Sequence, residues 1–349
     1  MDLAKYLLEE QRLHPSLAPQ DVVKLCYQAA FGAEHMLSDA TQAKAYLLEE
    51  YEATPVDDRP LVEYISQAVC RVNLAAWKRL KLNPDWLWNI FLSSVTAEGN
   101  DTSGDIFETY ITQVDELSKL EEFSFSNAQW REYISAYNVA GCTPIRHSPA
   151  YRGNETPAYR VISGQITKLI PIFEAMPGRE GGVIAIDGRA AAGKSTLAGN
   201  LSKVINAGTI AMDDFFLPPE LRTTERLAEP GGNVHYERFI DEILPNLRTG
   251  QGFKYRSFDC SRMEYSPVLN EVRPSLWHIV EGVYSHQPVL GNYMDVRVFM
   301  DISPKEQQSR IENRNAPKIA ARYLNEWIPM EEAYFDTFNI HKAADVVVD

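Results

Sequence analysis

The chain has few cysteines and no long hydrophobic run. Its four cysteines lie far apart and form no C-x-x-C pair: Cys26, Cys70, Cys142 and Cys260. This spacing argues against a disulfide framework and a zinc site, and reduced thiols are typical of the cytoplasm. No eighteen consecutive residues are apolar, and the first residues lack the apolar stretch of a signal peptide. We therefore expect a soluble cytoplasmic protein without a membrane partner.

Positive charge is also in short supply. The 34 Lys and Arg residues face 48 Asp and Glu residues, a net charge of −14. Nucleic-acid binding depends on neutralising phosphates, so this balance argues against a nucleic-acid partner but allows a local basic pocket for a small phosphorylated ligand. Hydrophobic residues at 45% and charged residues at 23% are typical of a folded protein, and 349 residues predict two domains. The composition is compatible with an oligomer.

Residues 1–140 carry apolar residues at helical spacing. Asp21 is placed as the N-cap or a first-turn acid of the first helix. Turn-forming residues over 98–105 predict a loop, and no alternation with a period of two is evident. We therefore predict an all-helical N-terminal domain, with helices that include residues 21–30, 61–81 and 86–92.

Residues 141–180 predict a connector and a linking helix. Pro144, Pro149 and Pro157 exclude one continuous helix, which indicates an extended connector up to about residue 160. A short amphipathic helix follows, with its apolar face made by Ile166, Leu169, Ile170 and Phe173.

Residues 181–349 alternate between short apolar runs and helical patterns. Continuous apolar runs of this length are typical of buried parallel strands. They occur at residues 183–187, 207–212, 277–283, 296–301 and 344–348. The alternation predicts an α/β domain with a mostly parallel sheet flanked by helices.

The first of these strands runs into a phosphate-loop motif, G-x-x-x-x-G-K-[ST]. Its glycines let consecutive N–H groups point at one anion, and the following helix adds its positive dipole end. Lys194 can reach the β- and γ-phosphates of ATP, and the Ser195 hydroxyl is a natural Mg²⁺ ligand. The predicted ATP-binding residues are Gly188, Arg189, Ala190, Ala191, Ala192, Gly193, Lys194, Ser195 and Thr196.

Acidic residues end the next two strands. Asp213 and Asp214 follow the second strand, at the sheet edge where ligands bind in α/β folds. A carboxylate there can take a proton from an attacking hydroxyl, although the pair could instead cap the next element. Glu281 ends the third strand and could hold a magnesium-bound water, or form a surface salt bridge. Together with Ser195 it is the predicted metal site.

Arginines follow the fourth strand on a helical segment. Arg310 and Arg314 are four residues apart and share a helix face, with Arg322 further on. Such arginines can neutralise charge on a phosphoryl group in transfer, so Arg310 and Arg314 are predicted to be catalytic together with Lys194. The alternative is a solvated helix in which Glu306 and Glu312 pair with them.

In these residues the C-terminal half resembles the uridine kinase, phosphoribulokinase and pantothenate kinase group of P-loop kinases. The phosphate loop, Met212-Asp213-Asp214-Phe215-Phe216, Ile279-Val280-Glu281-Gly282 and Ala344-Asp345-Val346-Val347 match in order over residues 181–349. The resemblance implies a P-loop NTPase fold, ATP and Mg²⁺ as cofactors, Asp213 as the general base and Asp214 in a supporting, substrate-binding role.

The acceptor side departs from uridine kinases. The resemblance aligns His235, Tyr255 and Arg262 with substrate-binding positions, and Phe239 also aligns. Val234, however, stands where the ribose-binding Asp would be, and Cys260 replaces a base-contacting His. The chain therefore carries the kinase motifs without two of the polar groups that recognise uridine.

The N-terminal half resembles a small bacterial domain of unknown role. The resemblance covers Pro19–Leu37, with Phe31-Gly32-Ala33-Glu34-His35-Met36-Leu37, and a later His147-Ser148-Pro149-Ala150-Tyr151-Arg152. His35 and His147, with Glu34 and Arg152, could converge into a polar pocket for an anion. The alternative is a capped helix end and a hydrogen-bonded connector.

These features favour an ATP-dependent kinase that phosphorylates a hydroxyl of a nucleoside-like, sugar or other polar small molecule. A GTPase would carry N-K-x-D, which is absent, and a transporter ATPase would carry a signature like L-S-G-G-Q after the phosphate loop, where none occurs. The alternative is a nucleotide-responsive regulatory protein whose helical domain recognises a partner.

Overall fold

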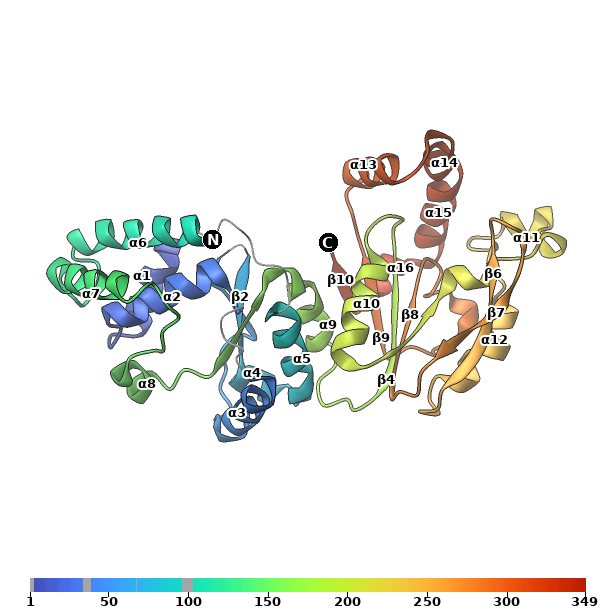
Figure 1. The fold of residues 1–349 in the computed structure, drawn as a ribbon. Helices are drawn as coiled ribbons and strands as arrows, with labels where there is room; N and C mark the ends of the chain where they lie inside the picture. The colour runs from blue at the N-terminus through green and yellow to red at the C-terminus, as the bar shows by residue number, and fades with distance from the viewer. Residues whose placement is uncertain (1–2, 34–38, 67, 96–102) are drawn as a thin grey trace. The chain divides into compact units, whose positions relative to one another are not determined.

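A computed structural model describes residues 3–33, 39–66, 68–95 and 103–349 (Figure 1). The chain divides into two compact units, Met1–Thr167 and Lys168–Asp349. Each is described here by itself. Within the described ranges, no helix is long and apolar enough to cross a membrane.

Helices make up most of the N-terminal unit. Helices α1, α2, α6 and α7 pack together around a buried core that includes Leu7, Leu25 and Trp130. The unit's helices are α1 (Leu3–Leu13), α2 (Pro19–Phe31), α3 (Ala40–Ala53), α4 (Leu74–Arg79), α5 (Pro84–Val95), α6 (Ser103–Lys119), α7 (Asn127–Val139) and α8 (Pro149–Glu155). The predicted helices over 21–30 and 86–92 are therefore confirmed as parts of α2 and α5.

The N-terminal unit also contains a sheet, so the prediction that it is all-helical is wrong. Strands β1 (Val62–Tyr64), β2 (Val69–Asn73) and β3 (Tyr159–Ser163) form an antiparallel sheet with β2 in the middle. They replace most of the helix predicted over 61–81, of which only α4 remains. Every residue of β2 is buried, so the strand shows no polar–apolar alternation and its apolar spacing imitates a helix.

The predicted connector belongs partly to this unit. Ser148 caps α8 by accepting the Tyr151 N–H at 3.1 Å, and Pro149 occupies the first turn, where its missing N–H costs nothing. Residues 159–163 then pair with β2, so the segment is not an extended connector throughout. The linking helix is present as the 3₁₀ helix η2 (Gly164–Leu169) followed by α9 (Ile170–Glu174). In the predicted loop, residues 103–105 open α6, and residues 98–102 lie outside the described ranges.

A five-stranded parallel sheet forms the centre of the C-terminal unit (Figure 1). Its order is β10-β9-β4-β8-β5, and it confirms all five predicted strands. The strands are β4 (Gly182–Gly188), β5 (Gly208–Ala211), β8 (Trp277–Glu281), β9 (Val296–Met300) and β10 (Val346–Val348). All residues of the central β4 are buried, which explains its continuous apolar run.

Helices and a hairpin surround this sheet. Helix α10 packs on β4, β5 and β8, while α9 and α16 lie against β10 and β9. The helices are α10 (Lys194–Ile205), α11 (Thr224–Ala228), α12 (Tyr236–Glu242), α13 (Pro304–Arg314), α14 (Pro317–Arg322), the π-helical η7 (Tyr323–Trp327), α15 (Ile328–Phe338) and α16 (Ile340–Ala343). Strands β6 (Phe253–Asp259) and β7 (Glu264–Val272) form a separate antiparallel hairpin, which contacts the short 3₁₀ helix η3 (Met212–Phe215).

A buried carboxylate joins three segments where β4 ends. Asp187 is inaccessible to solvent. One oxygen accepts the N–H groups of Gly188 at 2.7 Å and Tyr284 at 3.3 Å. The other accepts the His286 N–H at 3.0 Å and the Tyr334 hydroxyl at 2.8 Å. The phosphate loop, the segment after β8 and α15 are thus held by one side chain.

Asp187→Asn should destabilise the C-terminal unit. An amide offers one acceptor oxygen, and its NH₂ group would face donors, so buried N–H or O–H groups would lose their acceptor at a cost of about 3 kcal/mol. Urea unfolding of the full chain, followed by circular dichroism, measures the loss. The matched control is Asp241→Asn, on the exposed side of α12, and it should leave the midpoint unchanged. An unchanged midpoint for Asp187→Asn would contradict this role.

Candidate active site

The phosphate loop adopts a tight curl between β4 and α10. Gly188 has a φ of 135°, and a Cβ there would lie 2.1 Å from the Met300 carbonyl oxygen. Gly193 has a φ of 103°, and Ala191 also has a positive φ, at 61°. Only glycine avoids a clash at the first of these positions. The curl precedes the N-terminus of α10 at Lys194, so backbone N–H groups and the helix dipole are available to an anion.

Lys194 reaches back over this loop. Its Nζ donates to the carbonyl oxygens of Gly188 at 2.7 Å and Arg189 at 2.9 Å. The ammonium is thereby held where a phosphate chain lying on the loop would meet it. This arrangement fits the phosphates of a nucleoside triphosphate.

Ser195 and Glu281 meet across the ends of α10 and β8. The Ser195 hydroxyl lies 3.1 Å from both carboxylate oxygens of Glu281. One hydroxyl and one carboxylate are oxygen ligands of the kind that Mg²⁺ uses together with phosphates and water. No group of three or more His, Cys, Asp or Glu side chains able to hold a metal occurs among the described residues. A magnesium ion here would therefore rely on nucleotide phosphates for further ligands.

The two neighbouring aspartates point to different surroundings. Asp214 accepts hydrogen bonds from the Tyr255 hydroxyl at 2.7 Å and the Asn270 amide at 2.8 Å, which tie it to the β6–β7 hairpin. Asp213 instead has Lys194 as its main favourable charge, and it adds its charge to the surroundings of Glu281. Asp213 is thus the aspartate that faces the phosphate loop.

Negative charge exceeds positive charge around Lys194. Asp213 is open to water on one side, yet crowding by protein atoms raises its pKa, with Lys194 acting against the rise and Asp214 adding to it. Burial also raises the pKa of Glu281, reinforced by Asp213 and opposed by Ser195 and Lys194. Carboxylates that raise one another's pKa favour a bound cation. The charge balance therefore fits a magnesium ion at this place.

Glu331 on α15 is a site residue that the sequence analysis missed. It is buried, and its Oε2 accepts the Ala190 N–H at 3.0 Å across 141 residues of sequence. Burial raises its pKa to about 7, opposed by Lys194 and the Ala190 N–H and reinforced by Asp187 and Asp213. Nothing local marks it, since it lies in an ordinary helix of acidic and apolar residues.

The predicted arginines lie on and beyond α13. Arg310 donates from Nη1 to the Ala191 carbonyl at 3.0 Å and pairs with Glu306, so it reaches the phosphate loop. Arg314 is exposed and lies beside Tyr323, whose surroundings also include Asp213. Arg322 pairs with Glu326 at 3.2 Å and stacks on Trp327, as in the solvated-helix alternative.

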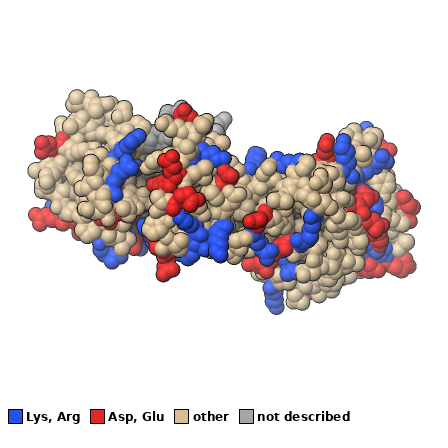
Figure 2. Space-filling model, turned by 90° about the horizontal axis from the view of Figure 1, so that it is seen from below, with Lys and Arg blue, Asp and Glu red and all other residues tan. Residues whose placement is uncertain are grey.

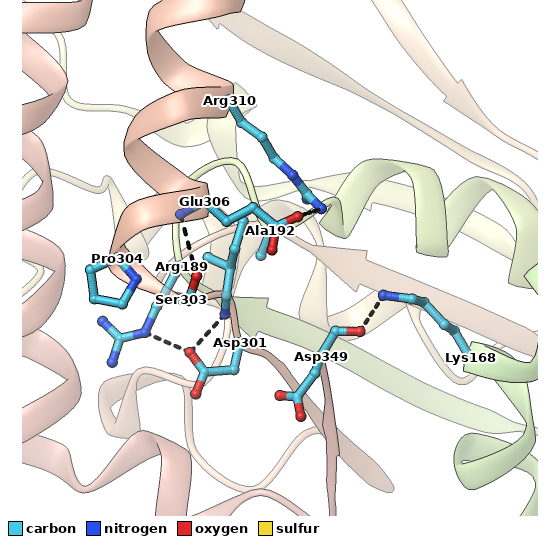
Figure 3. A pocket seen from close by; sticks show the side chains of 10 residues that line it. Lys168, Arg189, Ala192, Asp301, Ser303, Pro304, Glu306, Arg310 and Asp349 are labelled. Carbon is cyan, nitrogen blue, oxygen red and sulfur yellow. Dashed lines mark hydrogen bonds and ion pairs between the residues drawn. The ribbon is translucent and has the colours of Figure 1, made fainter.

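A hollow of about 600 Å³ lies beside the phosphate loop (Figure 3). Arg189 crosses it and donates to Asp301 at 2.7 Å, and Arg310 reaches over it from α13. The lining residues come from the loop, the start of α13 and the segments around residues 168 and 349: Lys168, Arg189, Ala192, Asp301, Ile302, Ser303, Pro304, Glu306, Arg310 and Asp349. Its volume is in the range that binds small organic ligands.

The predicted acceptor residues do not all converge. Tyr255 contacts Asp214, as described above. His235 opens α12, and its Nδ1 is buried without a partner among the described residues. Arg262 is exposed at the hairpin turn and faces Glu264 at 3.5 Å, so the structure does not bring it to Asp213.

The two departures from the uridine kinase pattern also lie apart. Val234 is fully buried in the core of the unit, where it contacts no ligand. Cys260 lies exposed beyond the end of β6, and its surroundings include Arg222 and Asp213. Arg222, from the segment after η4 (Pro219–Leu221), is a second residue that the sequence analysis missed. No motif pointed to it.

The polar pocket predicted in the N-terminal unit is described only in part. Glu34 and His35 lie outside the described ranges. Both ring nitrogens of His147 are engaged, with Asp21 at 2.9 Å and the Tyr159 hydroxyl at 2.8 Å. Asp21 also accepts the Ala18 N–H in the first turn of α2. Arg152 is exposed and lies 3.5 Å from the Tyr46 hydroxyl, so it does not join His147.

Surface charge is mixed on the face shown in Figure 2. Basic and acidic side chains are interspersed there, and no broad basic patch covers this face. A nucleic-acid partner would require clustered positive charge.

The fold and the loop together define the class of the C-terminal unit. A central β4, a phosphate loop, α10 and a β10-β9-β4-β8-β5 parallel order make a P-loop NTPase sheet. The C-terminal unit has the P-loop kinase fold.

Three solved structures are similar to this chain. They are a candidate fructose transport system kinase from Silicibacter sp. TM1040 (22% identity, 52% of this chain, 96% of that chain, TM-score 0.42), a possible uridine kinase from Bacillus stearothermophilus (21%, 53%, 97%, 0.40) and D-glycerate 3-kinase from Cryptococcus neoformans (16%, 49%, 88%, 0.37). No protein-family model and no curated protein matches the chain. The case for an activity rests on the residues of the site.

Glu331→Gln should change how stability depends on pH. The folded protein keeps the Glu331 proton up to about pH 7, whereas the unfolded chain loses it near 4.5. Stability of the parent therefore falls as pH rises from about 4.5 to 7. Gln cannot titrate and keeps an acceptor for Ala190. The variant should gain up to about 3 kcal/mol relative to the parent between pH 5 and pH 8.

Urea unfolding of parent and variant at both pH values measures this difference. Glu312→Gln, on the exposed side of α13, is the matched control and should follow the parent at both. Equal stability differences at pH 5 and pH 8 for Glu331→Gln would show that Glu331 is ionised in the folded protein throughout.

Proposed function

We propose that the protein is an ATP-dependent phosphotransferase that transfers the γ-phosphoryl group to a hydroxyl of a small polar metabolite. One observation carries the proposal: Asp213 shares the surroundings of Lys194 and Glu281, while its neighbour Asp214 is held by Tyr255 and Asn270. This separates one free carboxylate, facing the phosphate loop, from one structural carboxylate.

The nucleotide would be held by the phosphate loop. The N–H groups of the loop and Lys194 would bind the β- and γ-phosphates, and Ser195 with Glu281 would hold Mg²⁺. The ion supplies charge neutralisation to the phosphates when bound. The hollow beside Arg189 and Arg310 is the place next to the loop with room for the rest of the nucleotide.

Asp213 would act on the acceptor. It takes the proton of the acceptor hydroxyl as the oxygen forms its bond to the γ-phosphorus, and the bond to the ADP oxygen breaks. A raised pKa makes this carboxylate a better proton acceptor than an ordinary surface aspartate. Lys194 and Arg310 stabilise the negative charge on the phosphoryl group during transfer.

The acceptor is proposed to be a sugar-like or other hydroxylated metabolite other than uridine. Val234 is packed in the core, and the Cys260 thiol takes the place of a histidine near Asp213. Neither offers the ribose and base contacts that the uridine kinase pattern requires. Each unmet polar group costs about 1–3 kcal/mol of binding.

Asp213→Asn should lower kcat by about 10²- to 10⁴-fold with little change in nucleotide affinity, because asparagine keeps the shape but cannot accept the proton. The readout is ATP consumption with the acceptor that the parent uses, together with nucleotide binding by calorimetry. Asp214→Asn is the matched control and should lose less, since it faces the hairpin. A larger loss in Asp214→Asn would exchange the two roles.

A screen of nucleosides, sugars and vitamin precursors should find an acceptor that raises ATP turnover and gains one phosphoryl group by mass. Uridine and cytidine should be poor acceptors. Lys194→Ala should abolish the turnover and remain folded. Efficient phosphorylation of uridine at micromolar concentration would refute the specificity argument. ATP turnover that no hydroxylated compound stimulates would favour a nucleotide-responsive regulatory protein instead.

A further inference from the structure

The N-terminal unit has a guanidinium in its interior. Arg71 lies in the central strand β2 and is 3% exposed. It pairs with Val161 of β3 and Glu63 of β1 in the sheet register, and the side chain reaches Glu10 of α1. A buried charge is costly unless every N–H finds an acceptor. The partners of Arg71 therefore need to be counted.

Only one edge of this guanidinium is paired. Nη1 donates to Glu10 Oε2 at 3.0 Å, and the Tyr159 ring lies face-on, 4.2 Å from Cζ to the ring centroid. Nε and Nη2 are buried and have no hydrogen-bond partner within the described ranges. These two N–H groups point the same way along one edge, which is the fork that binds two oxygens of a carboxylate or phosphate.

Further unpaired groups surround the same cation. The Tyr6 ring lies 5.4 Å from Arg71 Cζ, and the buried Tyr6 hydroxyl has no partner in the described chain. Gln28 accepts the Tyr159 hydroxyl at 3.4 Å through Oε1, while its buried Nε2 is likewise unpaired. Three N–H donors and a hydroxyl thus lack an acceptor around one ring, and each would cost free energy if left so.

Positive charge is in excess at this place. Lys24 on α2 is half-buried, and burial together with Arg71, Arg152 and Arg146 lowers its pKa to about 8, against the pull of Asp21. Asp21 is already engaged by Ser148, which donates from its N–H at 2.8 Å and its hydroxyl at 2.7 Å, and by His147. Glu10 is paired with Arg71. The nearby acids are therefore committed, and Lys24 remains positively charged at neutral pH.

We propose that the N-terminal unit binds a small anion, a carboxylate or phosphate group of a metabolite, on the Nε–Nη2 edge of Arg71. Lys24, Gln28 and Tyr6 complete the site. His147 is a positioning residue, because its contact with the Tyr159 hydroxyl fixes the ring on which the guanidinium stacks. The site is separate from the phosphate loop and does not depend on the proposed kinase activity.

Calorimetric titration of the full chain with inorganic phosphate and, separately, with acetate tests the proposal. The titrations use parent and Lys194→Ala chains at pH 7 and low chloride. Phosphate held by the loop should be lost in Lys194→Ala, whereas the Arg71 site should still bind one equivalent of at least one probe. A response to phosphate alone indicates a phosphorylated metabolite, and a response to acetate alone indicates a carboxylate.

Variants on the Lys194→Ala chain locate the binding. Arg71→Lys keeps the charge but removes the fork, and it should weaken binding at least tenfold. Lys24→Gln, at a half-buried position that tolerates change better, should also weaken it about tenfold and covers the case in which Arg71→Lys does not fold. Lys5→Gln, exposed on α1, is the matched control and should bind like its parent.

Two results would overturn the proposal. One is the absence of any phosphate or acetate binding by the Lys194→Ala chain, which would mean that water alone meets these donors. The other is binding that neither Arg71→Lys nor Lys24→Gln weakens. Neither result would bear on phosphoryl transfer at Lys194 and Asp213, so the failure of this site and of the proposed function are distinguishable.

Discussion

The buried Asp187 carboxylate holds together the part of the C-terminal unit on which the phosphate loop depends. Its four donors come from the loop itself, from the backbone at Tyr284 and His286, and from the Tyr334 hydroxyl of α15. A charge without access to water is stable only when all its acceptor sites are filled. Movement of any one of these segments would leave that charge unpaired, so the loop entry and α15 behave as one body.

This coupling brings Glu331 to the loop. It lies three residues before Tyr334 on α15, one helical turn away, and reaches the Ala190 N–H. Lys194 thus has carboxylates on several sides, Asp213 and Glu331 among them. An excess of acids around one lysine is unfavourable for the protein alone and favourable for one that takes up a cation with its nucleotide. The same electrostatics that raise these pKa values therefore suit a phosphoryl-transfer site.

The N-terminal unit solves a different electrostatic problem. Its central strand buries Arg71 between tyrosine rings and pairs it with Glu10, and Asp21 is satisfied by Ser148 and His147. These polar groups tie α1, α2, β2 and the segment before α8 to one another. Polar groups that are fully paired specify one arrangement of their elements, whereas unpaired ones call for a ligand.

Much of the C-terminal unit could be predicted because its signals are local. The G-x-x-x-x-G-K-[ST] pattern determines the curl of the loop, since the needed glycine at 188 and the helix start at Lys194 are neighbours in sequence. The strands of a parallel sheet are buried on both faces, so each appears as one apolar run. In the N-terminal unit the same property misled, because the fully buried β2 is short and its valines also fit helical spacing.

What only the tertiary structure decided are the partners. Asp213 and Asp214 are equivalent by sequence, and the β6–β7 hairpin distinguishes them by giving Asp214 the Tyr255 and Asn270 donors. Glu331 meets a loop 141 residues away, and Arg71 meets Glu10 across 61. Amino-acid order alone determined the loop, the five parallel strands and the chemistry on offer. Which side chains share a site depended on packing between distant segments, which no local pattern records.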